Sequence, residues 1–205
     1  MCGIMKRVLF KDQDVRSVLN QKLEKKYRDA DTIIINELGL LQGLCRVDVA
    51  VINGIIHGYE IKSEADTLER LPLQAEYYSK VMDKLTLVCS ESHFDDAIKI
   101  IPDWWGIKVA KRTKQNNIKL YTYRTEHKNK NVDPAALIEL LWKNEVSDLL
   151  IEKGLPNNII HKNKSFLYEL CVNEYSLKDL KDNVRLKLKT RTNWRDHEPL
   201  LLNVG

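Results

Sequence analysis

The chain is poor in cysteine, proline and glycine, the residues that are abundant in disulfide-rich, fibrous and low-complexity proteins. Its 205 residues include only 4 Cys, 5 Pro and 8 Gly, and the four cysteines lie far apart. That spacing argues against a zinc knuckle or a disulfide framework and favours reduced thiols. No apolar run approaches the roughly 18 residues that cross a bilayer, and the first residues lack a secretory signal. We therefore expect a cytoplasmic protein with no membrane partner.

Several familiar motifs are also missing. The chain contains no P-loop, no Gly-x-Gly-x-x-Gly segment and no serine elbow, and its 5 histidines show no zinc-ligand spacing. It is 43% hydrophobic and 30% charged, which is enough apolar material for a core. Residues 1–107 carry 14 Lys/Arg against 17 Asp/Glu, whereas residues 108–205 carry 19 against 12. The basic second half suggests a phosphate-docking region, although charge alone favours a solvated helical surface.

The hydrophobic pattern predicts a mixed α/β layer followed by helices. Strands are predicted at 32–35, 46–52, 55–62, 85–89, 106–110 and 118–123, and helices at 12–28, 71–82, 94–101, 134–142, 146–153, 164–171 and 177–188. We divide the chain into a core of residues 1–125, a polar linker of residues 126–133, and a basic helical accessory region of residues 134–205.

Three charged residues interrupt the two strands of the predicted hairpin. Asp48 lies between Val47 and Val49, and Glu60 and Lys62 lie on the facing strand. A buried carboxylate without a partner costs several kcal/mol, so these positions require an explanation. Asp48 and Glu60 could form an oxygen pocket for Mg²⁺, with Lys62 holding one of its waters.

This arrangement resembles the PD-(D/E)XK nuclease superfamily over roughly residues 32–110, with Val47 in place of the eponymous proline. The resemblance implies a restriction-endonuclease-like core, with a central mixed sheet flanked by helices, plus a small C-terminal helical unit. Gln74 and Tyr78 fit the Gln-x-x-x-Tyr motif of the RecB-like branch. By the resemblance, Asp48 and Glu60 bind metal and Lys62 positions the nucleophile.

The resemblance also assigns roles to three neighbouring side chains. Gln74 and Tyr78 would contact substrate or the region of Lys62, and Glu37 would help to hold the metal. Purely structural interpretations remain open for most of these residues and for the neighbouring Arg70. Tyr78 fits the apolar stripe of its helix, Glu37 could cap or bridge at a strand end, and Arg70 could simply solubilise the helix. Asp48 and Lys62 could form an internal ion pair, with Glu60 on a solvated edge.

The register of the hairpin decides between these interpretations. A two-residue turn at Asn53-Gly54 pairs Asp48 with Tyr59 and sends Glu60 to the opposite face. A three-residue loop from Asn53 to Ile55 sets Asp48 opposite Glu60, and a bulge near Gly58 would also restore the phase. We predict one of these two irregularities.

The functional expectation is a Mg²⁺-dependent nuclease that hydrolyses DNA with a metal-activated water, with Mn²⁺ as a substitute. The sequence does not distinguish single-stranded, duplex and branched DNA, or DNA from RNA. The basic helices would follow phosphates. The alternative is a catalytically silent nucleic-acid-binding or protein-interaction module on the same fold, from a phage-defence or mobile-element setting. The resemblance also allows a homodimer.

Overall fold

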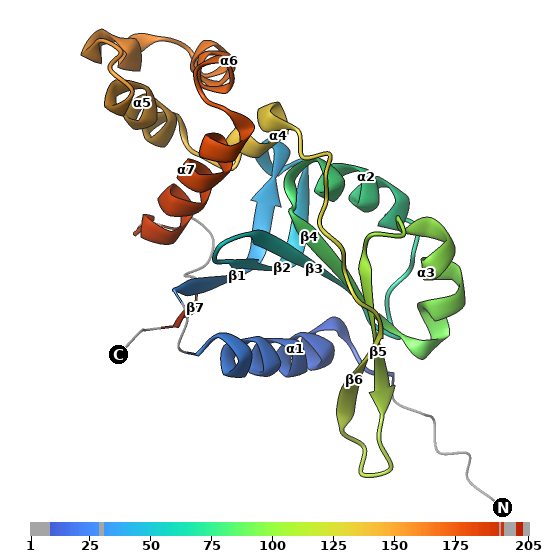
Figure 1. The fold of residues 1–205 in the computed structure, drawn as a ribbon. Helices are drawn as coiled ribbons and strands as arrows, with labels where there is room; N and C mark the ends of the chain where they lie inside the picture. Colours follow the sequence, from blue (N-terminus) through green and yellow to red (C-terminus); the bar gives the residue numbers. More distant parts are fainter. Residues whose placement is uncertain (1–8, 29–30, 193, 195–199, 203–205) are drawn as a thin grey trace, which may run out of the picture.

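The computed structural model describes residues 9–28, 31–192, 194 and 200–202. Its centre is a seven-stranded sheet with the order β6-β5-β4-β3-β2-β1-β7 (Figure 1). The strands are β1 (Thr32–Leu40), β2 (Cys45–Ile52), β3 (Ile56–Lys62), β4 (Lys84–Ser90), β5 (Gly106–Arg112), β6 (Ile118–Arg124) and β7 (Leu200–Leu202). Strands β3, β4 and β5 are parallel and the remaining neighbours are antiparallel, so the sheet is mixed as predicted.

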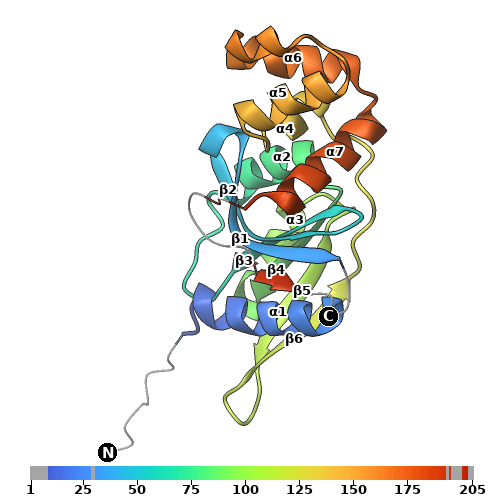
Figure 2. The ribbon, with the colours of Figure 1, turned by 90° about the vertical axis from the view of Figure 1, so that its left-hand side faces the viewer.

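Helices cover both faces of the sheet. The α-helices are α1 (Asp12–Tyr27), α2 (Leu71–Val81), α3 (Phe94–Ile100), α4 (Pro134–Ile138), α5 (Lys143–Glu152), α6 (Lys164–Glu174) and α7 (Leu177–Thr190). Short 3-10 turns are η1 (Leu41–Gly43), η2 (Glu91–His93) and η3 (Asn157–His161). Helix α1 lies on one face, α2 and α3 lie on the other, and α4 to α7 gather at one end (Figures 1 and 2). The β5–β6 hairpin projects from the opposite end.

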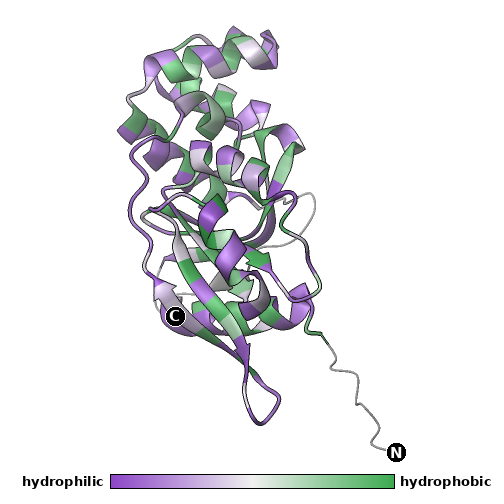
Figure 3. Ribbon diagram, turned by 90° about the vertical axis from the view of Figure 1, so that its right-hand side faces the viewer, coloured by the Kyte–Doolittle hydropathy of each residue, from purple (hydrophilic) through white to green (hydrophobic). Residues whose placement is uncertain are grey.

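Two hydrophobic clusters fill the space on either side of the sheet. Under α1, Leu19 packs in one cluster with Val51 and Tyr59 of the sheet. On the other face, Tyr78 of α2 and Leu188 of α7 belong to one continuous cluster. The helices accordingly carry both hydrophobic and hydrophilic stretches along their length (Figure 3).

The hairpin has the register that brings Asp48 and Glu60 to the same region. Ile52 pairs with Ile56, and the series continues to Val49 opposite Tyr59. Three residues, Asn53 to Ile55, therefore form the loop, and the Asn53 side chain accepts a hydrogen bond from the Ile55 amide at 3.1 Å. The three-residue loop is confirmed, and the two-residue turn is wrong.

A second irregularity, which the sequence did not predict, lies at Glu37 and Asp48. In a regular strand, side chains on the same face are an even number of residues apart. Ile35 and Leu38 of β1 belong to the same core cluster although they are three residues apart, so the alternation of inward and outward side chains changes phase between them. Glu37 has a positive φ of 58°, and it faces Asp48 between the pairs Asn36–Val49 and Leu38–Val47. The shift keeps apolar side chains in the core on both sides of two polar positions.

The C-terminal region packs directly on the sheet domain. Residues 126–133 are tied down rather than loose, since the amide of buried Asn129 donates to the carbonyls of Ser79 and Met82 at 2.7 and 2.9 Å. The chain then returns after α7, and β7 pairs with Thr32–Ile34 at the edge of the sheet, which was not predicted. The predicted C-terminal helical unit is confirmed, but its core is continuous with that of the sheet.

Cys45, Cys89 and Cys171 are free thiols, while Cys2 lies outside the described residues. Within the described ranges, no helix combines the length and apolar composition needed to cross a membrane.

Candidate active site

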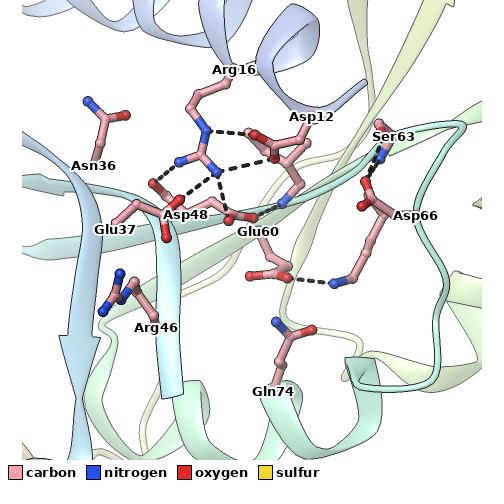
Figure 4. A network of polar contacts seen from close by, with 12 residues as sticks. Asp12, Arg16, Asn36, Glu37, Arg46, Asp48, Glu60, Ser63, Asp66 and Gln74 are labelled. Carbon is pink, nitrogen blue, oxygen red and sulfur yellow. Dashed lines mark hydrogen bonds and ion pairs between the residues drawn. The ribbon is translucent and has the colours of Figure 1, made fainter. Parts of the chain in front are cut away.

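Most of the predicted site residues line one pocket of about 470 Å³ between α1, the ends of β2 and β3, and the start of α2 (Figure 4). The polar lining comprises Asp12, Arg16, Glu37, Arg46, Asp48, Glu60, Lys62, Asp66, Arg70 and Gln74. Tyr78 is the exception, because it is fully buried behind the pocket wall. Tyr78 therefore positions other groups and does not itself face the pocket.

Glu60 and Lys62 form a buried ion pair on β3. Lys62 Nζ lies 2.8 Å from Glu60 Oε1, and the two side chains are only 5% and 2% exposed. The pair excludes the alternative in which Glu60 lies on a solvated edge and Lys62 pairs with Asp48. Burial raises the pKa of Glu60 above its ordinary range, although the contacts with Lys62, Tyr78 and Gln74 oppose that shift.

Tyr78 and Gln74 support Glu60 from α2. The Tyr78 hydroxyl lies 2.9 Å from Glu60 Oε2 and 2.5 Å from the Arg46 carbonyl oxygen, and it accepts a hydrogen bond from Gln74 Nε2 at 3.1 Å. The helical spacing of four residues places both side chains on the face that meets the strand. Gln74 Oε1 is buried without a hydrogen-bond partner. Gln74 and Tyr78 therefore hold Glu60 in place, and Gln74 Oε1 remains an acceptor without a hydrogen bond.

Asp48 is held by both of its carboxylate oxygens. Oδ2 accepts a hydrogen bond from the backbone amide of Ile61 at 2.6 Å, and Oδ1 lies 2.9 Å from Arg16 Nη2. Burial, and then repulsion from Glu60, raise the pKa of Asp48 to about 8, even though Ile61 and Arg16 act to lower it. Burial is thus the main reason that the pKa of Asp48 is raised, and the nearby charge of Glu60 adds to it.

Arg16 is the site residue that the sequence did not reveal. From α1 its guanidinium contacts Asp12 Oδ1 at 2.8 Å, Asp48 Oδ1 at 2.9 Å and Glu37 Oε1 at 2.7 Å (Figure 4). It also donates to the Asp48 carbonyl oxygen at 2.5 Å. The only available signal was the i, i+4 spacing of Asp12 and Arg16, which is equally typical of a solvated helix face.

The structure does not gather Glu37, Asp48 and Glu60 into one metal cluster. Glu37 is bound to Arg16, and among the described residues no group of three or more His, Cys, Asp or Glu side chains could hold a metal ion. The predicted third carboxylate is thus in the pocket but engaged elsewhere. Glu37 bridges to Arg16 from within β1 (Thr32–Leu40), and not from a strand end as in the alternative interpretation.

The remaining donors still suit Mg²⁺. This ion is usually held by one or two carboxylates together with waters and substrate phosphate oxygens, rather than by a complete protein cage. Asp48 and Glu60 supply two carboxylates whose mutual repulsion a cation would relieve. The unpartnered Gln74 Oε1 offers a further oxygen to a coordinated water. These residues fit a hydrated divalent cation in the pocket.

Most cations of α7, and Arg191 directly after it, have partners within the chain. Lys181 contacts Asp83 at 2.7 Å, Lys187 contacts Glu152 at 2.9 Å, and Arg191 contacts Glu145 at 2.6 Å. Much of the positive charge that suggested phosphate docking therefore stabilises packing. Arg46 and Arg70, by contrast, are exposed and line the pocket itself.

Comparisons with known proteins place the chain in a family. The family model described as bacteriophage P4 protein cII matches residues 5–200. The chain belongs to the phage P4 cII family. Protein cII of Enterobacteria phage P4 is 26% identical over 184 residues, which cover 89% of this chain and 68% of that protein. The descriptions of the cII family and this relative name no activity or ligand.

One solved structure resembles this member of the cII family at a low level. It is a protein of unknown function from Silicibacter pomeroyi, with 19% sequence identity and a TM-score of 0.40. The match covers 66% of this chain and 89% of that protein.

Proposed function

We propose that this cII-family protein is a Mg²⁺-dependent nuclease that hydrolyses phosphodiester bonds of DNA. The observation that carries the proposal is the buried Glu60–Lys62 pair in a pocket shared with Asp48. A buried ion pair is weak evidence for stability alone, because desolvation offsets much of the Coulombic gain. A site that places a buried ion pair and a partly buried carboxylate beside one pocket is better explained by chemistry.

Each residue has a distinct part in the proposed reaction. Bound Mg²⁺ would polarise the phosphate and lower the pKa of a coordinated water. Asp48 and Glu60 would hold the ion. Lys62 Nζ has three N–H donors and gives one to Glu60 Oε1, so another is left to orient the attacking water. Tyr78 and Gln74 would keep Glu60 in place. The water would lose a proton to solvent as its oxygen bonds to phosphorus, and the ester oxygen would leave with its bonding electrons and take up a proton from solvent.

Arg46 and Arg70 are the side chains that we expect to contact the DNA phosphates. Both are exposed at the pocket, unlike the largely paired cations of α7. Contacts of this kind give salt-sensitive affinity that is independent of sequence.

A cleavage assay tests the proposal. The protein, a Lys62→Met variant and a Lys80→Met control are incubated with single-stranded, duplex and branched DNA and with Mg²⁺ or Mn²⁺. Lys80 is on α2 but pairs with Glu76 on the surface. We expect Lys62→Met to slow cleavage by about 100-fold or more, while Lys80→Met cleaves normally. Equal cleavage by Lys62→Met would remove the role of Lys62, and no cleavage of any substrate would reject the nuclease.

The second candidate is a catalytically silent binding module, and the position of Arg16 favours it. A guanidinium between Asp48 and Glu37 already neutralises part of the acidic site without a metal. Membership of a phage protein family supports the mobile-element setting of this alternative. If the module is silent, millimolar Mg²⁺ or Mn²⁺ leaves the melting temperature unchanged, because a ligand that binds only the folded state must stabilise it.

A further inference from the structure

Arg16 forms an ion pair with Asp48, and its guanidinium also contacts Asp12 and Glu37. Nε contacts Asp12, which lies one helical turn earlier on α1 and keeps the side chain anchored at 2.8 Å. Nη2 contacts Asp48 Oδ1, Glu37 Oε1 and, at 3.2 Å, Asp12 Oδ2, while Nη1 donates to the Asp48 carbonyl oxygen at 2.5 Å. The side chain is 17% exposed, so the pairs with Asp48 and Glu37 are only partly screened by solvent.

Among the described residues, Arg16 is the cation that forms an ion pair with Asp48. Lys62 is bound to Glu60, and its contact with that carboxylate is buried. The acidic residues of the pocket lining are Asp12, Glu37, Asp48, Glu60 and Asp66. Arg16 therefore serves as the counter-ion of Asp48 in the protein without metal.

We propose that Arg16 competes with the divalent cation for Asp48, so that metal binding requires the guanidinium to release Asp48 Oδ1. This inference rests on the proposed metal-dependent function. A cation at Asp48 and the guanidinium of Arg16 cannot share Oδ1 without bringing two positive charges together. The affinity of the free protein for metal is therefore lower than its carboxylates alone would give.

The geometry allows the exchange without unfolding the site. Asp48 Oδ2 stays bound to the Ile61 amide at 2.6 Å, so the carboxylate keeps its orientation when Oδ1 changes partner. Arg16 keeps the bond from Nε to Asp12 and the bond from Nη1 to the Asp48 carbonyl oxygen, so only Nη2 has to leave Asp48 Oδ1. The exchange is confined to one oxygen of Asp48 and one side chain of α1.

Titration with Mn²⁺ tests the competition in the full-length protein. Dissociation constants are measured by calorimetry for the wild type, Arg16→Gln and Arg16→Met, and melting temperatures are measured with EDTA and with Mn²⁺. Arg16→Gln keeps an amide that can bond to Asp48 and Asp12, so one variant remains informative if Arg16→Met folds poorly. Lys25→Met is the matched control, because Lys25 is an exposed cation of α1 outside the pocket lining.

The expected result is a Kd for Mn²⁺ that falls by about tenfold or more in the Arg16 variants and is unchanged in Lys25→Met. Mn²⁺ should also raise the melting temperature of the Arg16 variants more than that of the wild type. Equal or weaker Mn²⁺ binding in both Arg16 variants, with wild-type binding that Asp48→Asn abolishes, would overturn the competition and leave the metal site intact. No Mn²⁺ binding in any of the proteins would overturn both.

Discussion

The Asp48 carboxylate accepts a hydrogen bond from the backbone amide of Ile61 at 2.6 Å, across the point where β2 and β3 stop pairing. The last ladder pair is Val49 with Tyr59, and beyond it a side chain serves as the acceptor that a carbonyl would otherwise provide. The same bond fixes the orientation of the carboxylate in the pocket. Asp48 is thus both part of the sheet and part of the site.

Replacing Asp48 should separate these two roles. Asp48→Asn keeps an oxygen for the Ile61 amide and removes the charge that repels Glu60, so its free energy of unfolding should match or exceed that of the wild type at pH 8. Asp48→Ala leaves a buried N–H unpaired and should lose about 1–3 kcal/mol. Urea unfolding measures both effects. Equal stability of the two variants would contradict the structural role, and undiminished Mn²⁺ binding by Asp48→Asn would contradict the metal role.

Glu60 and Lys62 should behave as a coupled pair. Lys62→Met leaves a buried carboxylate without its cation and should cost about 3–5 kcal/mol, less if Glu60 takes up a proton. The double variant Glu60→Gln/Lys62→Met removes both charges and should recover most of that loss. A double-mutant cycle by chemical denaturation measures the coupling. The cycle also includes the single variant Glu60→Gln. If the stability losses of Glu60→Gln and Lys62→Met add up to the loss of the double variant, the ion pair at 2.8 Å contributes nothing to the fold.

His57 should make the fold sensitive to acid. Its ring is buried between Thr86 Oγ1 at 2.9 Å and the Tyr59 hydroxyl at 3.2 Å, and burial lowers its pKa to about 4. Because the unfolded chain binds the proton more readily, this contribution to stability is complete above pH 6.5 and is lost as the pH falls through 4. The loss should approach about 3 kcal/mol at pH 4.

His57→Gln removes the titrating ring and should flatten the curve of unfolding free energy against pH between 6.5 and 4. The comparison uses denaturant unfolding at several pH values, with His161→Gln as the control, since His161 is exposed in η3. A His57→Gln curve as steep as that of the wild type would assign the acid sensitivity to other groups.

DNA affinity should depend on Arg46 and Arg70 more than on the basic helix. Arg46→Ala and Arg70→Ala should each weaken binding and lower the slope of log K against log salt by about 1. Lys187→Ala should leave the slope unchanged, because Lys187 Nζ is 2.9 Å from Glu152 Oε1. Fluorescence anisotropy over a range of salt concentrations measures the slopes. A larger loss of DNA affinity and slope in Lys187→Ala than in the Arg46 and Arg70 variants would indicate that α7 binds the phosphates.

Local pattern was sufficient for much of this molecule. The helix that contains Gln74 and Tyr78 begins near Pro72 as its apolar spacing indicates, and Asp48, Glu60 and Lys62 were noticed because charges are costly within apolar strands. The three-residue loop after Asn53 was one of the stated options. The positions of charged residues in strands thus carried the main signal for the site.

The sequence by itself determined the succession of strands and helices from α1 to α7 and the mixed α/β class. It also singled out a group of five side chains, which are Asp48, Glu60, Lys62, Gln74 and Tyr78. Only the tertiary structure decided that Arg16 neutralises Asp48 and Glu37, that the strands shift phase at Glu37, and that β7 returns to the edge beside β1. The physical reason is the distance along the sequence over which each interaction acts. Periodicity and turn chemistry act over a few residues, whereas an ion pair between Arg16 and Asp48 forms only after folding brings a helix and a strand together.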